Sequence, residues 1–226
     1  MKKCNISCNL NSCFLCKGCL KEWLPALENE RQNFVFTKGR SIFSEGDPVT
    51  GIYFLYYGKV KVATKWGQGK QLILRFAKQG DIIGYRGIGN DKVYPVSATA
   101  LEEVNVCFIN SAFFETTLHV NHSLTYQFMQ FYANELQEVE KRMINLAHMD
   151  VKGRVAETLL MLKKRFGETE GFINISLTKQ DLASYAGTTY ETFSRMIGEL
   201  EKEKIVCQSG KSFGIVNEQK LIELLG

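Results

Sequence analysis

Residues 189–195 read TYETFSR, and the sequence around them predicts a helix-turn-helix with this heptapeptide on its second helix. Thr178 is placed to cap the first helix, with Asp181 at its third position. Thr188 is placed to cap the second helix, with Glu191 in the same relation. Gly187 stands between them, where a tight turn needs the left-handed backbone that glycine adopts without strain.

Small and apolar residues at matching positions support the same motif. Ala183 is small enough for the two helices to cross closely. The residues that we expect to be buried between the helices are Leu182, Ala186, Phe193 and Met196.

Length and composition set broad limits on the class of protein. The chain has 226 residues, 45% of them hydrophobic, which gives room for two compact domains. No apolar run approaches the ~20 residues of a membrane span, and the basic start is followed by Asn, Ser and cysteines where a signal peptide has an apolar core. We therefore expect a cytoplasmic protein without membrane association, whose cysteines bind metal or react with oxidants.

The first two segments differ sharply in pattern. Residues 1–30 form a leader with cysteines in the spacing C-x3-C-x4-C-x2-C-x2-C, followed by a short helical stretch. Residues 31–118 contain short β-rich runs punctuated by glycine, which predict an antiparallel barrel or jelly roll. The leader cysteines are Cys4, Cys8, Cys13, Cys16 and Cys19.

Residues 119–149 are predicted to form a long helix with an apolar seam. Six apolar residues follow one another at spacings of 3, 4, 3, 4 and 3, and charged residues flank them. This pattern favours a parallel coiled-coil dimer; the alternative is a helix packed on its own barrel. The seam residues are Met129, Tyr132, Leu136, Val139, Met143 and Leu146.

Residues 150–226 are predicted to form a winged helix-turn-helix domain. A helix over 151–166 precedes the motif, and IVCQSGKSFGIV after it predicts two short strands around a Ser-Gly-Lys-Ser turn. This domain holds 11 Lys+Arg and 11 Asp+Glu, so it is formally neutral. Nucleic-acid contacts must then come from a local face, for which Lys179, Arg195 and Lys211 are candidates.

Three residues of the second helix are suited to reading base edges in a major groove. Glu191, Ser194 and Arg195 share one helix face, where Arg can bind guanine bidentately and Glu can accept from cytosine. Glu191 could instead serve only in the capping box. Arg195 could instead be a surface ion-pair partner. The further predicted DNA contacts are Thr188, Thr189, Tyr190, Lys179 and Lys211.

A glycine-punctuated barrel (GKVKV at 58–62, GDIIG at 80–84), a seam helix and ETFSR at 191–195 follow one another in this order. The arrangement resembles the CRP/FNR family of bacterial transcription regulators from about residue 35 onward. The resemblance implies an α+β fold: a cyclic-nucleotide-binding-type antiparallel β jelly-roll barrel, a long dimerisation helix and a C-terminal winged helix-turn-helix. It also implies a homodimer on an inverted repeat of double-stranded DNA, with RNA polymerase as a partner. No catalytic motif is present, so we do not expect an enzyme.

The E-x-x-S-R spacing is similar to that of the FNR branch, in which these residues contact a TTGAT-type half-site. Tyr190 fits neither branch. In cyclic-nucleotide-binding members, a Gly-Glu pair holds the ribose and Arg-Ser or Arg-Thr holds the phosphate. Here Tyr85 follows Gly84, and Val96 precedes Ser97, so a bound phosphodiester would lack that countercharge unless Arg86 supplied it. These five residues remain a candidate pocket for another small molecule.

The oxygen-sensing FNR branch is similar in having an N-terminal cysteine cluster and one barrel cysteine, which together bind a [4Fe–4S] cluster. The resemblance implies Cys13, Cys16, Cys19 and Cys107 as ligands, with Cys8 as the alternate. Cys107 alternates with Val104, Val106 and Phe108, which places it on the strand face opposite to that trio.

The cysteines also allow other interpretations. The leader could bind a structural zinc ion with four thiolates or form a redox-switched disulfide, and Cys107 could be a small buried hydrophobe. Cys207 is expected only to pack. If an iron–sulfur cluster is bound, its assembly would join the leader to Cys107 and change the packing along the seam. DNA binding would then depend on redox state or oxygen.

Overall fold

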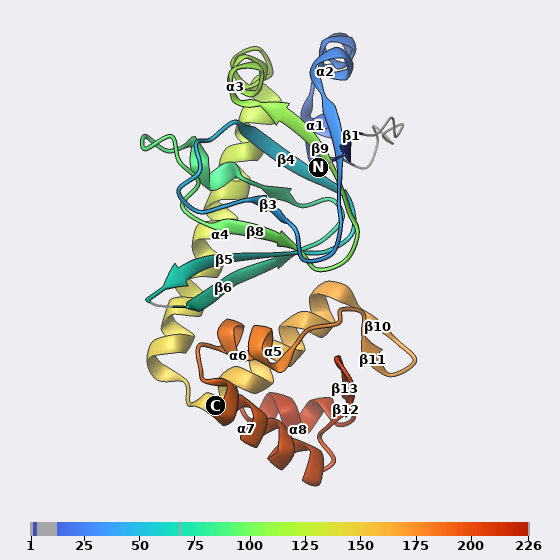
Figure 1. The fold of residues 1–226 in the computed structure, drawn as a ribbon, viewed down its shortest axis with the longest axis vertical. Helices are drawn as coiled ribbons and strands as arrows, with labels where there is room; N and C mark the ends of the chain where they lie inside the picture. The colour runs from blue at the N-terminus through green and yellow to red at the C-terminus, as the bar shows by residue number, and fades with distance from the viewer. Residues whose placement is uncertain (1, 4–12, 68, 226) are drawn as a thin grey trace. The chain divides into compact units, whose positions relative to one another are not determined.

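Strands β1 to β9 pair into two antiparallel sheets in the computed structural model, which describes residues 2–3, 13–67 and 69–225 (Figure 1). One sheet has the strand order β1-β2-β9-β4-β7 and the other β3-β8-β5-β6. The predicted jelly-roll barrel is therefore confirmed. The strands are β1 (Lys2–Lys3), β2 (Gln32–Phe36), β3 (Ser41–Phe43), β4 (Gly51–Tyr57), β5 (Val60–Trp66), β6 (Lys70–Ala77), β7 (Ile82–Ile83), β8 (Ser97–Ala100) and β9 (Val104–Asn110).

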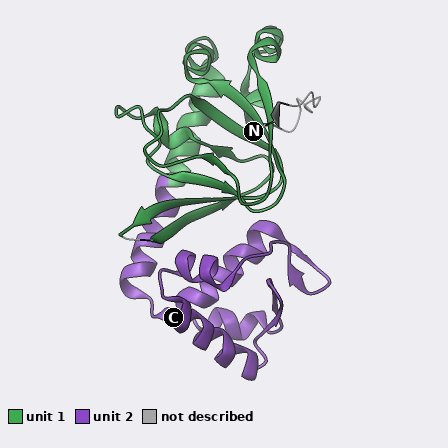
Figure 2. Ribbon diagram, viewed as in Figure 1, with its two compact units in different colours: residues 1–135 green, residues 136–226 purple. Residues whose placement is uncertain are grey.

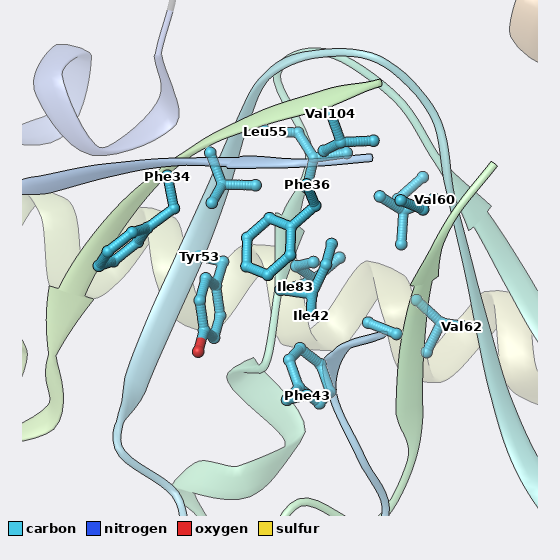
Figure 3. Close-up of a cluster of buried hydrophobic side chains, with 14 of the residues drawn as sticks. Phe34, Phe36, Ile42, Phe43, Tyr53, Leu55, Val60, Val62, Ile83 and Val104 are labelled. Atoms are coloured by element: carbon cyan, nitrogen blue, oxygen red, sulfur yellow. The ribbon is translucent and has the colours of Figure 1, made fainter. Parts of the chain in front are cut away.

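The barrel core forms because alternate residues of each strand face the space between the sheets. Phe34 and Phe36 from β2 pack there with Val104 and Val106 from β9 (Figure 3). β2 and β9 are neighbours, with Phe34 opposite Val106 and Phe36 opposite Val104. β4 and β5 contribute further apolar side chains from their own inward faces (Figure 3).

A second apolar cluster lies on the other face of β9. Cys107 and Ile109 belong to it, whereas Phe108 packs against the barrel core. The predicted orientation of Cys107 away from Val104, Val106 and Phe108 is therefore confirmed. This second cluster draws its side chains from the leader, the sheet and the helices after it.

Helices before and after the barrel surround this second cluster. The leader contains α1 (Phe14–Gly18), the 3-10 turn η1 (Lys21–Trp23) and α2 (Leu24–Glu30), and a second 3-10 turn, η2 (Tyr85–Ile88), follows β7. After β9 come α3 (Ser111–Val120) and α4 (His122–His148), separated by Asn121. Asn121 is fully buried, donates from Nδ2 to the Thr117 carbonyl at 2.8 Å and accepts from the Leu20 amide at 2.7 Å.

The chain divides into two compact units, Met1–Glu135 and Leu136–Gly226, so α4 belongs to both (Figure 2). Asp150 caps α5 by accepting from the Gly153 amide at 2.7 Å. The predicted 151–166 helix and the two-stranded wing are both confirmed. The second unit continues with α5 (Val151–Phe166), β10 (Glu168–Thr169), β11 (Phe172–Ile173), α6 (Lys179–Ala186), α7 (Tyr190–Lys202), β12 (Val206–Ser209), β13 (Ser212–Ile215) and α8 (Glu218–Glu223).

Replacing Asn121 with Ala removes the acceptor of the Leu20 amide and the donor to the Thr117 carbonyl. We expect Asn121→Ala to lower the free energy of unfolding by about 1–3 kcal/mol, because two hydrogen bonds, each contributing about 0.5–1.5 kcal/mol, are lost. Asn134→Ala, on the exposed part of α4, is the matched control and should stay within about 0.5 kcal/mol of the parent. Urea unfolding measures both, and equal effects would show that the bond to the leader contributes nothing.

Candidate DNA interface and cysteine site

The first helix of the helix-turn-helix begins as predicted. Thr178 Oγ1 accepts from the Asp181 amide at 3.0 Å and donates to Asp181 Oδ2 at 2.6 Å. Gly187 follows the helix in the left-handed conformation, with φ 65° and ψ 44°. The predicted cap and the predicted turn glycine are therefore both confirmed.

The second helix begins one residue later than predicted. Thr189, not Thr188, is its N-cap, and its Oγ1 accepts from the Thr192 amide at 3.2 Å. The amide of Thr188 instead donates to the Ala183 carbonyl at 3.0 Å, which completes the end of the preceding helix. The prediction of a Thr188 cap was wrong because this backbone closure uses the residue after Gly187. Glu191 is then the second residue of α7 and not the third-position member of a capping box.

The two faces of α7 differ in burial. Phe193 and Met196 are buried, as predicted, together with Leu182, Ala183 and Ala186 of the preceding helix. Ile197 and Leu200 continue the buried face. The buried face holds the helix in the domain, so that the opposite face is presented to solvent.

Glu191 and Arg195 lie on the exposed face of α7, and neither has a hydrogen-bond or ion-pair partner within the described residues. The described residues therefore offer no ion-pair partner for Arg195. The Ser194 hydroxyl oxygen differs, since it is buried and makes no hydrogen bond. Ser194 would have to change its rotamer to reach a base. Of the other predicted contacts, Thr189, Tyr190 and Lys211 are exposed, whereas Thr188 and Lys179 are half-buried.

The end of α4 holds the turn of the helix-turn-helix in place. Arg142 donates to the Tyr185 carbonyl at 2.7 Å and lies 4.1 Å from the centre of the Tyr185 ring. Arg154 of α5 donates to the Ala186 carbonyl at 3.0 Å. A Cβ at Gly187 would come within 2.5 Å of Leu146 Cδ2. The sequence did not reveal these contacts because it carries no signal of which helix meets the turn.

The described leader cysteines lie in and beside one short helix. Cys13 is at the N-cap position of α1 without a side-chain capping bond, Cys16 lies within the helix and Cys19 is at its C-cap. Cys16 and Cys107 are buried in the second apolar cluster, against which Cys13 and Cys19 pack. Among the described cysteines no disulfide is formed. The alternate ligand, Cys8, lies outside the described residues.

The thiols influence one another electrostatically. A hydrogen bond with the Cys16 side chain lowers the pKa of Cys13 to about 6, against the opposing effect of burial. Burial, with the charge of Cys13 adding to it, raises the pKa of Cys19 to about 11. These shifts agree with the packing of Cys13, Cys16 and Cys19 in and against the same apolar cluster.

The donor set fits thiolate ligation in its chemistry. Iron–sulfur clusters and structural zinc both take cysteine thiolates, and the structure gathers four thiols around one apolar cluster. Within the described part of the chain, no group of three or more His, Cys, Asp or Glu side chains is already spaced to hold a metal ion. Metal binding would thus require the side chains to rearrange.

The leader is fastened to the junction of α3 and α4. The Trp23 indole donates to Thr117 Oγ1 at 3.1 Å and stacks on Phe113, with ring centres 5.8 Å apart. Gly18 lies against α4, where a Cβ would come within 2.5 Å of Leu124 Cδ1. Sequence reasoning missed these residues; the tryptophan in a polar leader was the one available signal.

The candidate effector residues are distributed between two environments. Val96 lies in the barrel core, whereas Tyr85 belongs to the second cluster. Gly84 has a left-handed backbone that places Tyr85, and Ser97 Oγ accepts from the Glu45 amide at 2.9 Å. An effector role for these residues stays a prediction.

Two glycines of the helix-turn-helix provide an opposed pair of stability tests. Gly187→Ala should lower the free energy of unfolding by at least about 1–2 kcal/mol, because the new Cβ would be strained at positive φ and would meet Leu146. Gly198→Ala, within α7, should raise it by about 0.5–1 kcal/mol, since its Cβ would meet no atom within 4 Å. Thermal unfolding of both variants checks the signs, and a shift in the same direction would contradict the described turn.

Two family models match the chain in succession. Residues 34–121 match the cyclic nucleotide-binding domain and residues 153–224 match the Crp-like helix-turn-helix domain. No helix in the described part of the chain is long and apolar enough to span a membrane. The order of the two domains agrees with the fold described above.

Curated relatives and solved structures agree with these matches. The fumarate and nitrate reduction regulatory protein of Vibrio cholerae is 31% identical over 193 residues, which are 84% of this chain and 76% of the relative. The anaerobic regulatory protein of Bacillus subtilis is 30% identical over 198 residues, 85% of this chain and 82% of the relative. The structure of FixK2 from Bradyrhizobium japonicum shares the fold with a TM-score of 0.77, at 24% identity, over 87% of this chain and 98% of that one. The barrel, the exposed face of α7 and these relatives together show that the chain belongs to the CRP/FNR family and is a DNA-binding transcription regulator, not an enzyme.

Proposed function

We propose that this regulator is a homodimer that binds a TTGAT-like inverted repeat and is gated by oxygen or redox state through a cysteine-held iron–sulfur cluster. The observation that carries the proposal is the gathering of Cys13, Cys16, Cys19 and Cys107 around one apolar cluster that also contains part of α4. Relatives named anaerobic regulatory proteins support a response to oxygen.

DNA recognition is assigned to the exposed face of α7. Arg195 can donate two parallel hydrogen bonds to guanine, and Glu191 can accept from cytosine. Both side chains are exposed, and because Thr189 caps the helix, Glu191 is not needed for that purpose. Tyr190, also exposed, adds a contact surface beside them.

Dimerisation is assigned to the apolar seam of α4. Met129 is 62% exposed and Met143 is 63% exposed, and Leu136 and Val139 lie exposed between them. A row of large apolar side chains on one helix indicates a protein interface. A second copy of the same helix presents the same row, so the two seams can pack together around a two-fold axis. A dimer of this kind would present paired recognition helices to two half-sites. RNA polymerase is the protein partner that membership of the family implies.

The four cysteine thiolates would hold the cluster, with Cys8 as an alternate. When bound, an iron–sulfur cluster supplies an oxygen-sensitive redox centre. The protein contributes the thiolates, and the apolar surroundings limit the access of water. Leu15 and Phe54, both buried in the same cluster of side chains, belong to these surroundings.

Aromatic contacts give the leader a direct path to the seam. Phe14, next to Cys13, lies 6.2 Å from Phe128 and 6.0 Å from Phe131, between ring centres. Phe128 in turn lies 5.1 Å from the ring of the seam residue Tyr132. A shift of α1 on cluster assembly would therefore alter packing beside the dimer seam. In the second unit, the contact of Leu146 with Gly187 connects the seam to the helix-turn-helix.

The ligand assignment is tested by serine variants purified without oxygen. We expect a brown protein that contains iron and sulfide and bleaches in air, and we expect each Ser variant at Cys13, Cys16, Cys19 or Cys107 to lose the absorption band. Cys207→Ser, which changes a wing cysteine paired with Gly214, is the control and should keep it.

Three results would contradict this assignment in different ways. A colourless protein with one equivalent of zinc would show that the cysteines hold a zinc ion and not an iron–sulfur cluster. A metal-free protein with an air-formed disulfide would indicate a thiol switch. Equal operator affinity of the protein with and without the cluster would show that the cluster does not control DNA binding.

Base reading by Arg195 predicts a loss of discrimination. Arg195→Ala should lower the preference for the operator over random DNA by about 1–3 kcal/mol, because the bidentate bonds to guanine disappear. Lys202→Ala removes the same charge from the end of α7 and should lower the affinity for operator and random DNA by the same factor. Fluorescence anisotropy at one salt concentration measures both ratios. An equal loss on both DNAs for Arg195→Ala would assign this residue to phosphate contact.

A further inference from the structure

Charged side chains meet where α4 lies against the barrel. Arg75 of β6 places Nη1 3.0 Å from Glu135 Oε1 of α4. The Tyr85 hydroxyl donates to Glu135 Oε2, and Arg86 Nη2 lies 3.7 Å from the same oxygen. Both oxygens of one carboxylate are therefore held by groups of the barrel.

The barrel groups also hold one another in place. Arg75 Nη1 donates to the Tyr85 hydroxyl oxygen at 3.2 Å, and Arg86 Nε donates to the same oxygen at 3.3 Å. Arg75 Nη2 lies 3.6 Å from Asp81. The two guanidinium groups and the phenol thus form a preorganised set of donors, in which Asp81 balances one of the two positive charges.

Burial makes this arrangement energetically significant. The side chain of Arg75 is 12% exposed and that of Glu135 is 24% exposed, so both charges have lost much of their water. Burial raises the pKa of the Tyr85 phenol, which therefore keeps the proton that it donates. A buried cation left without its anion is costly, because little solvent remains to replace the lost partner.

We propose that Arg75, Arg86 and the Tyr85 hydroxyl form a carboxylate-binding site on the barrel, and that Glu135 is its ligand, supplied by the chain's own α4. Two of these residues, Tyr85 and Arg86, belong to the pocket that the sequence predicted for a small molecule. An anionic effector at this position would have to displace Glu135.

The internal ligand also positions the dimerisation seam. Glu135 lies between the seam residues Tyr132 and Leu136 in sequence. The Tyr132 hydroxyl donates to the Tyr85 carbonyl at 2.6 Å, and the Tyr85 ring lies 4.9 Å from Phe131, between ring centres. One turn of α4 is therefore bound to Tyr85 through its backbone, its ring and its hydroxyl. Release of the carboxylate would remove the charged contact of that turn with the barrel and leave the contacts of Phe131 and Tyr132 with Tyr85.

Chemical rescue tests the site directly. Glu135→Ala in the full chain should melt at a lower temperature than the parent, and sodium acetate should raise its melting temperature more than sodium chloride at equal ionic strength. Acetate supplies the missing carboxylate to the vacated donors. Glu140→Ala, an equal change of charge at an exposed position of α4, should show no difference between the two salts. The double variant Glu135→Ala/Arg75→Ala should likewise lose the preference for acetate.

A double-mutant cycle provides a second test that does not depend on the stability of the alanine variant. The urea midpoints of Glu135→Gln, Arg86→Gln and the combined variant should be non-additive, since the two side chains share one interaction. Additive midpoints, or acetate and chloride acting alike on Glu135→Ala, would overturn the proposal. Neither test involves the cysteines, so its outcome is separate from that of the iron–sulfur proposal.

Discussion

The two-residue period of β9 is the constraint on which the rest of the first unit depends. Successive side chains of a strand point to opposite faces, and β9 is buried on both. Val104 and Val106 complete the barrel core, while Cys107 and Ile109 form part of the cluster that receives the leader. A slip of one residue in the pairing with β2 and β4 would exchange the two sets. The same register therefore determines the core and the position of the barrel cysteine.

α4 is the element that contacts both the leader and the helix-turn-helix, and in the function proposed above it carries the signal between them. Its first half packs on the leader and the barrel through Leu124 and Phe128, and its last turns contact the helix-turn-helix through Arg142 and Leu146. Of the seam residues, Tyr132 and Leu146 take part in these two sets of contacts, whereas Met129, Leu136, Val139 and Met143 between and beside them stay exposed. A helix is stiff over this length, so a change in packing at one end alters the surface offered to a second copy. The carboxylate of Glu135 adds a charged contact between the two ends.

Local signals in the sequence predicted those parts of the structure that depend on neighbouring residues. The Thr178 cap, the glycine turn and the helix from 151 to 166 all follow from short-range hydrogen bonding and periodicity. The Thr188 cap failed because two threonines stand side by side and either can cap a helix. The choice between them was made by the closure of the preceding helix, in which the Thr188 amide reaches back to Ala183.

Periods and spacings along the chain were enough to predict the barrel, the order of the domains, the helix-turn-helix and the face of Cys107, because each appears as a repeat or a spacing in the sequence. Tertiary structure alone decided that Asn121 accepts from Leu20, that Gly18 lies against Leu124, and that Arg75, Tyr85 and Arg86 surround Glu135. These partners are separated by tens of residues, and nothing in either stretch indicates the other. Long-range pairs of polar and charged groups become visible only when the packing of the apolar residues has brought them together.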